Sequence, residues 1–280
     1  MITLDSLQSD FNKIKSTEQM PVLFIGHGSP MNAIELNEFS QQWSILGKNL
    51  PQPSAILCIS AHWETRGTQV TAMKRPDTIH DFGGFPQALF DVNYPANGSP
   101  ELAAQIAHEF QNKKVGLNMD WGIDHGCWSI LVHLYPEANI PVLQLSLDYT
   151  MGAEAHFKLA EELAFLRNKG VLIIGSGNII HNLRQVRFGR SFGLEDYGYD
   201  WAIEMTDIIK NKILLEDYDA LINYEKLSNA SRLAIPTTDH YYPLLYALAL
   251  RGNKDNVTFF NDKILGGSIG MTYLLIDSQQ

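Results

Sequence analysis

The chain has 280 residues, of which 45% are hydrophobic and 19% charged, a composition typical of a folded globular protein rather than a disordered one. Its 31 acidic side chains against 21 basic ones give a net charge of −10, which argues against nucleic-acid or anionic-membrane binding. Two cysteines are too few for a zinc ribbon or a disulfide framework, and no apolar run approaches the roughly 20 residues of a membrane span. The first residues lack the features of a signal peptide, so we expect a cytoplasmic protein of open oligomeric state.

The predicted strands are short apolar runs, rich in β-branched residues and bounded by Gly, Pro or polar residues. Such runs are typical of strands that are buried on both faces of a sheet. The strongest occupy residues 21–25, 55–60, 141–145 and 171–174, and weaker candidates occupy residues 69–73, 257–260 and 267–275. Residues 1–20 are polar and aperiodic, and are predicted to form an N-terminal arm before a single domain of residues 21–280.

Helical periodicity fills the intervals between these runs. Phe39, Trp43 and Leu46 form one apolar stripe, and Ser99 followed by Pro100 is a typical helix start. Helices are predicted at residues 37–50, 99–112, 153–168, 201–215 and 241–250. The alternation of strands and helices predicts an α/β domain with a central, mostly parallel or mixed sheet flanked by helices on both faces.

The common catalytic motifs are absent. There is no phosphate-binding GxxxxGK[ST], no GxSxG and no HExxH. Gly175-Ser176-Gly177 follows a predicted strand but lacks the remaining glycine of a dinucleotide fingerprint. The nine histidines are therefore the main chemical signal.

Three histidines follow predicted strands, namely His27, His62 and His181. Ligands of open α/β sheets bind beyond the carboxyl ends of the strands, so we expect these imidazoles to converge. His240 opens the last predicted helix, and His125 lies in a loop before another. A lone histidine after a strand is usually a hydrogen-bonding loop residue, but two at successive strand ends favour a site for Zn, Fe or Cu.

The remaining candidates have more ordinary interpretations. His80 lies in the aromatic loop of residues 73–98, where a role near a pocket and packing of the loop on itself both stay open. Cys127 lies beside His125, and a Cys–His nucleophile pair is a weaker alternative. Three histidines within helical patterns are expected to serve surface or packing roles: His108, His133 and His156.

Six segments resemble one family in order and spacing. The chain is identified as a member of the class III (LigB-type) extradiol ring-cleavage dioxygenases, in the DOPA 4,5-dioxygenase-like subfamily, from about residue 21 to its end. The resemblance implies an α/β domain with a central mixed sheet flanked by helices. The segments are GHGSPMN (26–32), SAHWETRG (60–67), TIHDFGGFPQALF (78–90), WGIDHGCW (121–128), SGNIIHNL (176–183) and DHYYPLLY (239–246).

The resemblance also implies site residues. His27, His62 and His240 match the ligands of one divalent metal ion per chain. His181 matches a histidine beside the metal, which is the proposed acid/base in ring-cleaving members and a fourth ligand in some zinc-loaded relatives. His125 matches a histidine that faces the substrate.

One departure concerns the metal. Protocatechuate 4,5-dioxygenases place a glutamate where this chain has His240, so the expected set has no carboxylate. Fe(II) is expected for dioxygenase activity, but an all-histidine site also suits Zn(II), which we expect in purified protein. Asp124 and Asn182 are candidates to orient the imidazoles, with turn formation as the alternative.

The implied reaction is extradiol cleavage of a catechol by O2, with 4,5-cleavage of L-DOPA to 4,5-seco-DOPA. We expect His181 to take a catechol proton and return it later, and His125 to hydrogen-bond an oxygen atom. A zinc-dependent hydrolase and a non-catalytic metal-binding module are the alternatives. Three arginines near the expected pocket are candidates to meet a substrate carboxylate, although exposed arginine clusters are common: Arg184, Arg187 and Arg190.

Overall fold

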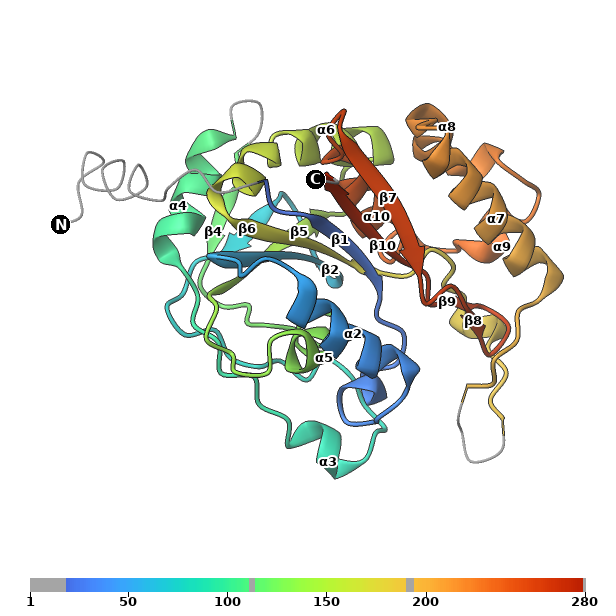
Figure 1. Cartoon of the computed structure of the whole chain (residues 1–280), viewed down its shortest axis with the longest axis horizontal. Helices are drawn as coiled ribbons and strands as arrows, with labels where there is room; N and C mark the ends of the chain where they lie inside the picture. The colour runs from blue at the N-terminus through green and yellow to red at the C-terminus, as the bar shows by residue number, and fades with distance from the viewer. Residues whose placement is uncertain (1–18, 111–113, 190–193, 279–280) are drawn as a thin grey trace.

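The computed structural model describes residues 19–110, 114–189 and 194–278. Figure 1 shows an open, twisted sheet with helices on both of its sides. The N-terminal arm predicted for residues 1–20 lies outside the described residues, apart from its last two. Among the helices of the described part, none is long and apolar enough to cross a membrane.

The strands form one large sheet and one short ribbon. The large sheet contains β1 (Val22–Gly26), β2 (Ala55–Thr65), β3 (Gln69–Thr71), β4 (Gly116–Asn118), β5 (Val142–Asp148), β6 (Val171–Gly177), β7 (Asp255–Phe260) and β10 (Tyr273–Ser278). The ribbon pairs β8 (Ile264–Leu265) with β9 (Ile269–Gly270). The order in the large sheet is β4-β3-β5-β2-β6-β1-β10-β7. Its centre, β5-β2-β6-β1, is parallel, whereas β10 and β7 are antiparallel, so the predicted mixed sheet is confirmed.

The four strongest predicted strands are the four central ones. Every residue of β1, β5 and β6 is buried, as expected for continuous apolar runs covered on both faces. The predicted end of the second strand was wrong, because β2 continues to Thr65 and His62 lies within it rather than after it. The pairing of β2 with β5 shifts register between Ile59 and Glu64. A bulge of this kind bends a strand and redirects its side chains near a site.

The helices of the described residues are α2 (Glu38–Asn49), α3 (Gln87–Phe90), α4 (Pro100–Glu109), α5 (His125–Leu134), α6 (Ala153–Glu161), α7 (Asp200–Leu214), α8 (Tyr218–Ile222), α9 (Ser231–Ala234) and α10 (Tyr242–Ala249). Helices α2, α4, α6, α7 and α10 occupy the predicted intervals with small differences, whereas the short helices α3, α8 and α9 were not predicted. The prediction that His125 lies in a loop before a helix was wrong by one position, because His125 is the first residue of α5. Ser99 caps α4 by accepting a hydrogen bond from the Leu102 amide, as its sequence predicts. The helix predicted at residues 153–168 breaks after Glu161 and continues as the 3-10 segment Ala164–Lys169.

Two hydrophobic cores lie on opposite faces of the sheet. Alternate residues of β1 divide between them: Val22 and Phe24 join one core, and Leu23 and Ile25 join the other. Helices α4, α6, α7 and α10 cover the first core. Helices α2 and α5 cover the second, which contains Trp128. Figure 1 shows α2 and α5 together on one side of the sheet and α6 on the other. The prediction of helices on both faces is confirmed.

The segment of residues 73–98 follows β3 and has little regular structure besides α3. Its two ends lie against each other, because a Cβ atom on Gly98 would stand 2.1 Å from the Met73 carbonyl oxygen. Its middle is tied to the loop before α5, since the Ile79 amide donates to the Ile123 carbonyl oxygen at 2.8 Å. The segment is therefore anchored beside the N-terminus of α5.

Candidate metal centre

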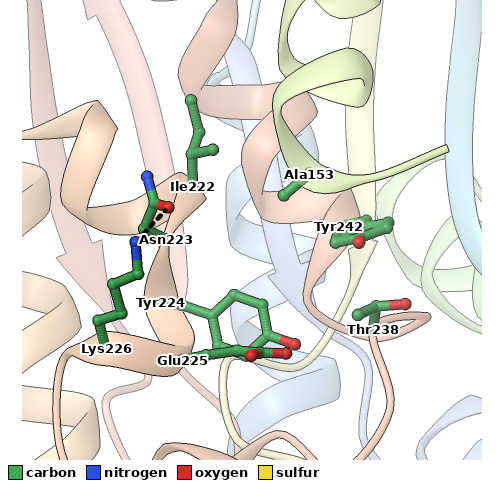
Figure 2. Close-up of a pocket in the computed structure, with 8 residues that line it drawn as sticks. All are labelled: Ala153, Ile222, Asn223, Tyr224, Glu225, Lys226, Thr238 and Tyr242. Atoms are coloured by element: carbon green, nitrogen blue, oxygen red, sulfur yellow. Dashed lines mark hydrogen bonds between the residues drawn. The ribbon is translucent and has the colours of Figure 1, made fainter.

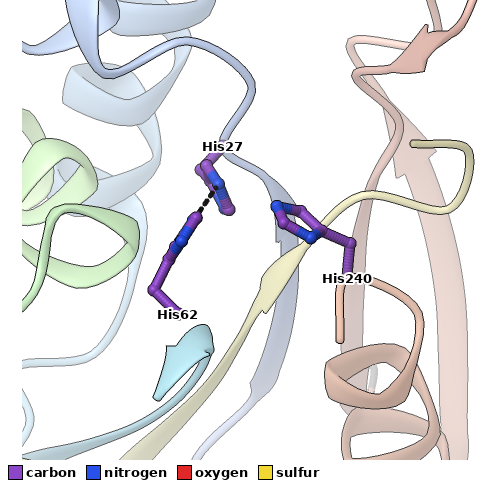
Figure 3. A group of neighbouring side chains, drawn as sticks. All are labelled: His27, His62 and His240. Atoms are coloured by element: carbon purple, nitrogen blue, oxygen red, sulfur yellow. Dashed lines mark hydrogen bonds between the residues drawn. The ribbon is translucent and has the colours of Figure 1, made fainter. Parts of the chain in front are cut away.

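Three histidines from distant parts of the chain meet at the carboxyl end of the central strands. His27 follows β1, His62 lies in β2 and His240 lies just before α10. Their ring centroids are 4.9 Å (27–62), 5.3 Å (27–240) and 5.1 Å (62–240) apart. One nitrogen of each lies within 4.8 Å of the other two. Figure 3 shows the three rings facing a common point.

The hydrogen bonds of His27 fix its tautomer. Its Nδ1 lies 3.0 Å from Ser176 Oγ, and the Ser176 hydroxyl itself donates to the Gly126 carbonyl oxygen at 2.5 Å. Because the Ser176 proton is already used, Oγ accepts from His27 Nδ1–H. The His27 Nε2 atom therefore carries a lone pair toward the centre.

The nitrogen geometry fits a divalent ion. The Nε2 atoms of His27 and His62 lie 3.0 Å apart. Two imidazole nitrogens bound to one ion at about 2.1 Å, with a right angle between them, also lie about 3.0 Å apart. A neutral imidazole is the ordinary histidine ligand, so the donor set suits a transition-metal cation.

His240 is oriented by its neighbour in the chain. Its Nδ1 donates to Asp239 Oδ2 at 2.5 Å, which leaves Nε2 as the nitrogen with the lone pair. Burial alone would raise the pKa of Asp239, but the hydrogen bond from His240 and the nearby imidazoles hold it well below its usual range. Asp239 thus has the position of a ligand-orienting carboxylate.

Burial keeps His27, His62 and His181 uncharged. Burial and the neighbouring imidazoles lower the pKa of His27 and of His62 well below the ordinary value. Burial, followed by the electrostatic effect of the neighbouring His240, lowers the pKa of His181 to about 2. These rings are consequently neutral at pH 7, and each has one ring nitrogen with a lone pair and one with a proton.

Glycine on β6 lets two of these segments approach. The His27 amide donates to the Gly177 carbonyl oxygen at 3.1 Å, and the Asn178 amide donates to the His240 carbonyl oxygen at 3.0 Å. A Cβ atom at Gly177 would lie 2.2 Å from that His240 oxygen. Only glycine permits this contact, which sets His240 against the end of β6.

His181 lies against His240 rather than between the other two imidazoles. The two rings stack with centroids 3.5 Å apart and planes 7° from parallel. The His181 amide donates to the Ala234 carbonyl oxygen, which fixes the backbone beside α9. His181 also forms a group with Asp239 and His240 whose potential ligand atoms lie within 4.8 Å of one another. The geometry is compatible with either expected role, a fourth ligand or an acid/base.

His125 is the first residue of α5, and its ring centroid lies 3.8 Å from that of His62. Asp81, from the segment of residues 73–98, accepts hydrogen bonds from the His125 amide at 2.9 Å and from its Nδ1 at 2.8 Å. Sequence reasoning gave Asp81 no role. No local pattern carries such a signal, since the contact joins residues 44 positions apart.

Asp124 and Asn182, the two candidate orienting residues, are each the N-cap of a helical segment. The buried Asp124 side chain accepts from the Ser60 hydroxyl and the Gln144 amide, both at 2.7 Å, and caps α5. The Asn182 side chain accepts from the Arg184 amide at 3.1 Å and donates to a backbone carbonyl at 2.7 Å. These contacts support turn formation, which the sequence left open as the alternative for both residues.

The other histidines have packing or surface positions. His108 is exposed on α4, and His133 Nε2 lies 2.9 Å from the Asn32 carbonyl oxygen. His156 is fully buried with Nδ1 3.0 Å from the Tyr246 hydroxyl. His80 Nε2 lies 3.0 Å from the Val92 carbonyl oxygen, so this loop packs on itself.

The Cys–His alternative loses support. Cys127 is 1% exposed, and burial raises the pKa of its thiol well above the ordinary value, which opposes thiolate formation.

The arginine candidates for a substrate carboxylate lie at the surface where they are described. Arg184 and Arg187 are exposed, and the Arg187 guanidinium lies 5.9 Å from the centroid of the Tyr197 ring. Arg190, the third candidate for a substrate carboxylate, lies outside the described residues.

Comparisons with known proteins agree with this geometry. The family described as "Catalytic LigB subunit of aromatic ring-opening dioxygenase" matches residues 21–264. A protein of Escherichia coli (strain K12) named "4,5-DOPA dioxygenase extradiol" is 43% identical over 262 residues, covering 92% of this chain and 95% of that protein. A protein of Beta vulgaris with the same name is 36% identical, covering 87% and 91%.

A solved structure shares the fold as well. The crystal structure of an uncharacterized protein from Escherichia coli K12 is similar with a TM-score of 0.80 and 38% sequence identity, covering 92% of this chain and all of that one. The matched residues include the four central strands of the sheet and the three converging histidines. The chain belongs to the LigB family of catalytic subunits of aromatic ring-opening dioxygenases.

Proposed function

We propose that this chain is a metal-dependent extradiol dioxygenase that cleaves the ring of L-DOPA between carbons 4 and 5. Family membership makes it an oxidoreductase of the ring-opening type, and similar proteins carry the name 4,5-DOPA dioxygenase extradiol. The observation that carries the proposal is the convergence of His27, His62 and His240, whose ring nitrogens lie within 4.8 Å of one another. We assign these three side chains as the metal ligands.

The metal and the residues have separate tasks. Fe(II) would supply open coordination positions for a catechol and O2 together with redox chemistry, which Zn(II) lacks. Ser176 and Asp239 hold the imidazoles of His27 and His240 by their Nδ1 atoms, so that both Nε2 atoms face inward. The residues therefore fix the geometry before a substrate arrives.

The side chains around the metal centre transfer protons and form hydrogen bonds during the reaction. His181, whose ring stacks on that of His240, accepts the proton of one catechol hydroxyl and returns a proton as the ring opens. His125, beside His62, hydrogen-bonds a substrate oxygen. The carbon–carbon bond next to the diol and the O–O bond break, and both oxygen atoms enter the semialdehyde product. No other oxidant or reductant is needed.

Two further assignments belong to this proposal. The first concerns the pocket: the segment of residues 73–98 lies beside His125, and we expect it to border the bound L-DOPA, whose side chain carries an ammonium and a carboxylate.

The second concerns the compartment. We place the enzyme in the cytoplasm, because the buried free thiols of Cys58 and Cys127 suit a reducing compartment.

The proposal is tested by oxygen uptake after anaerobic loading with Fe(II). With L-DOPA, we expect one O2 to be consumed per substrate and a new yellow chromophore to appear, whereas zinc-loaded protein should consume none. A panel of other catechols ranks the substrates. Protein that holds one iron per chain and consumes no O2 with any catechol would contradict ring cleavage, and ester or amide turnover with zinc alone would indicate a hydrolase.

His181→Ala tests the acid/base assignment. We expect the metal content to stay at that of the wild type while turnover falls by roughly 10²- to 10⁴-fold, since His181 transfers protons without being needed as a ligand. Metal analysis and oxygen uptake measure the two effects. Gln185→Ala, an exposed residue four positions further along the chain, is the matched control and should keep full activity. Loss of metal in His181→Ala would instead make His181 a ligand.

A further inference from the structure

Asp81 makes an unusual set of contacts for a loop carboxylate. Its Oδ1 accepts from the backbone N–H of His125 at 2.9 Å, and its Oδ2 accepts from His125 Nδ1 at 2.8 Å. Oδ2 also lies 3.6 Å from His62 Nδ1. One half-buried carboxylate thus reaches both the backbone and the ring of His125, and lies close to a proposed metal ligand.

These contacts determine which ring nitrogen of His125 carries the proton. A side-chain carboxyl group of ordinary acidity is ionised at pH 7. Both oxygens of Asp81 face nitrogens of His125 at hydrogen-bond distance, one on the backbone and one on the ring. A carboxylate can only accept, and therefore Nδ1 must be the donor. In the neutral imidazole, Nε2 is left with a lone pair.

The surroundings hold this pair in one arrangement. Asp124 caps α5 directly before His125, which fixes the backbone amide that Asp81 meets. The Phe82 ring lies edge-on against the His125 ring, with centroids 5.5 Å apart. The Trp128 indole N–H donates to the Ile79 carbonyl oxygen at 2.8 Å. The loop and α5 are thus joined on both sides of Asp81.

We propose that Asp81 is a positioning residue for ring opening, which holds His125 in the Nδ1–H form so that Nε2 receives a hydrogen bond from a catechol hydroxyl. The statement about the catechol rests on the proposed function, whereas the tautomer of His125 does not. Asp81 touches no reacting atom, and it acts through His125 alone. The same carboxylate also links the loop over residues 73–98 to the catalytic centre.

The wild-type protein supplies the first test. Zinc-loaded protein is diamagnetic, so ¹⁵N-histidine NMR can report the protonated nitrogen of each ring. The His125 signals are assigned by their loss in His125→Gln. We expect His125 to carry its proton on Nδ1. A proton on Nε2 at neutral pH would overturn the proposal, and this readout depends on neither activity nor substrate.

Asp81→Asn supplies the second test. The amide group places a donor opposite Nδ1, so the proton of His125 should move to Nε2 and the lone pair should be lost from the substrate side. We expect kcat to fall by about 10²- to 10⁴-fold, as when an orienting carboxylate is lost from a catalytic histidine. Metal content should be unchanged and KM should stay within about threefold. Asp91→Asn, an exposed residue of the same loop, is the control and should match the wild type.

A double variant separates positioning from simple structural support. If Asp81 acts through His125, Asp81→Asn should cost no further activity in the His125→Gln background. If the loss of activity in the double variant is instead the product of the losses in the two single variants, the proposal is contradicted. Asp81→Glu keeps the carboxylate and should retain more activity than Asp81→Asn. It is the variant to measure if Asp81→Asn does not fold. If the wild type opens no ring, the proposed function fails, and the NMR result still decides whether Asp81 sets the tautomer.

Discussion

His27→Ala is expected to lose both bound metal and ring opening. The His27 ring is 1% exposed and held by Ser176, so no other side chain can replace its Nε2 without moving β1. Loss of an orienting partner alone typically costs 10- to 100-fold in metal affinity, so loss of the ligand itself should cost at least about 100-fold. We expect less than about a tenth of an ion per chain after dialysis, and turnover below detection.

Metal analysis and oxygen uptake measure this prediction side by side. His108→Ala, an exposed histidine on α4, is the matched control and should retain the metal content and activity of the wild type. Circular dichroism checks that both variants are folded. A folded His27→Ala protein that holds one metal ion per chain would remove His27 from the ligand set and with it the proposed centre.

Asp255→Ala is expected to destabilise the protein by about 3–5 kcal/mol, because it leaves a buried arginine without its counter-charge. Asp255 lies at the start of β7, and Arg167 is fully buried before β6. Arg167 Nη1 donates to Asp255 Oδ2 at 2.5 Å and to the Leu250 carbonyl oxygen at 2.7 Å, and its Nε donates to the Met20 carbonyl oxygen at 2.7 Å. The pair thus joins four segments of the chain.

Urea unfolding of the metal-free protein measures this effect as a shift of the midpoint at constant slope. The double variant Arg167→Met/Asp255→Leu should unfold closer to the wild type than Asp255→Ala does, since it leaves no unpaired buried charge. Glu154→Gln breaks an exposed pair with Lys158 and should leave the midpoint unchanged. A loss below about 1 kcal/mol in Asp255→Ala would mean that water or another group compensates the Arg167 charge.

Much of this fold could be predicted because its signals are local. Continuous apolar runs identified β1, β2, β5 and β6, and buried parallel strands are the elements with the strongest sequence pattern. The convergence of His27 and His62 followed from a general property of parallel sheets, whose carboxyl ends form one edge. The extension of β2 past His62 was missed, because residues after the register shift no longer form a continuous apolar run.

The residues that orient the imidazoles could not be predicted in this way. Ser176 meets His27 across 149 positions, and Asp81 meets His125 across 44, so each contact exists only after the sheet has formed. Asp239 is adjacent to His240, but adjacency alone does not determine which atoms meet. The strands and helices can be predicted from the periodic pattern of their buried apolar residues. The contacts that orient the imidazoles depend instead on how the long loops are arranged in the folded chain.

The sequence positions of His27, His62 and His240 would also set the order in which the proposed metal site can form. Translation adds about 5–20 residues per second, so the 178 positions from His62 to His240 take roughly 10 to 40 s to synthesise. During that interval the nascent chain offers only two of the three imidazoles. The third arrives with α10, and it reaches the others only after its backbone docks on the end of β6. With the proposed ligand set, tight metal binding would therefore wait until His240 has docked on the end of β6.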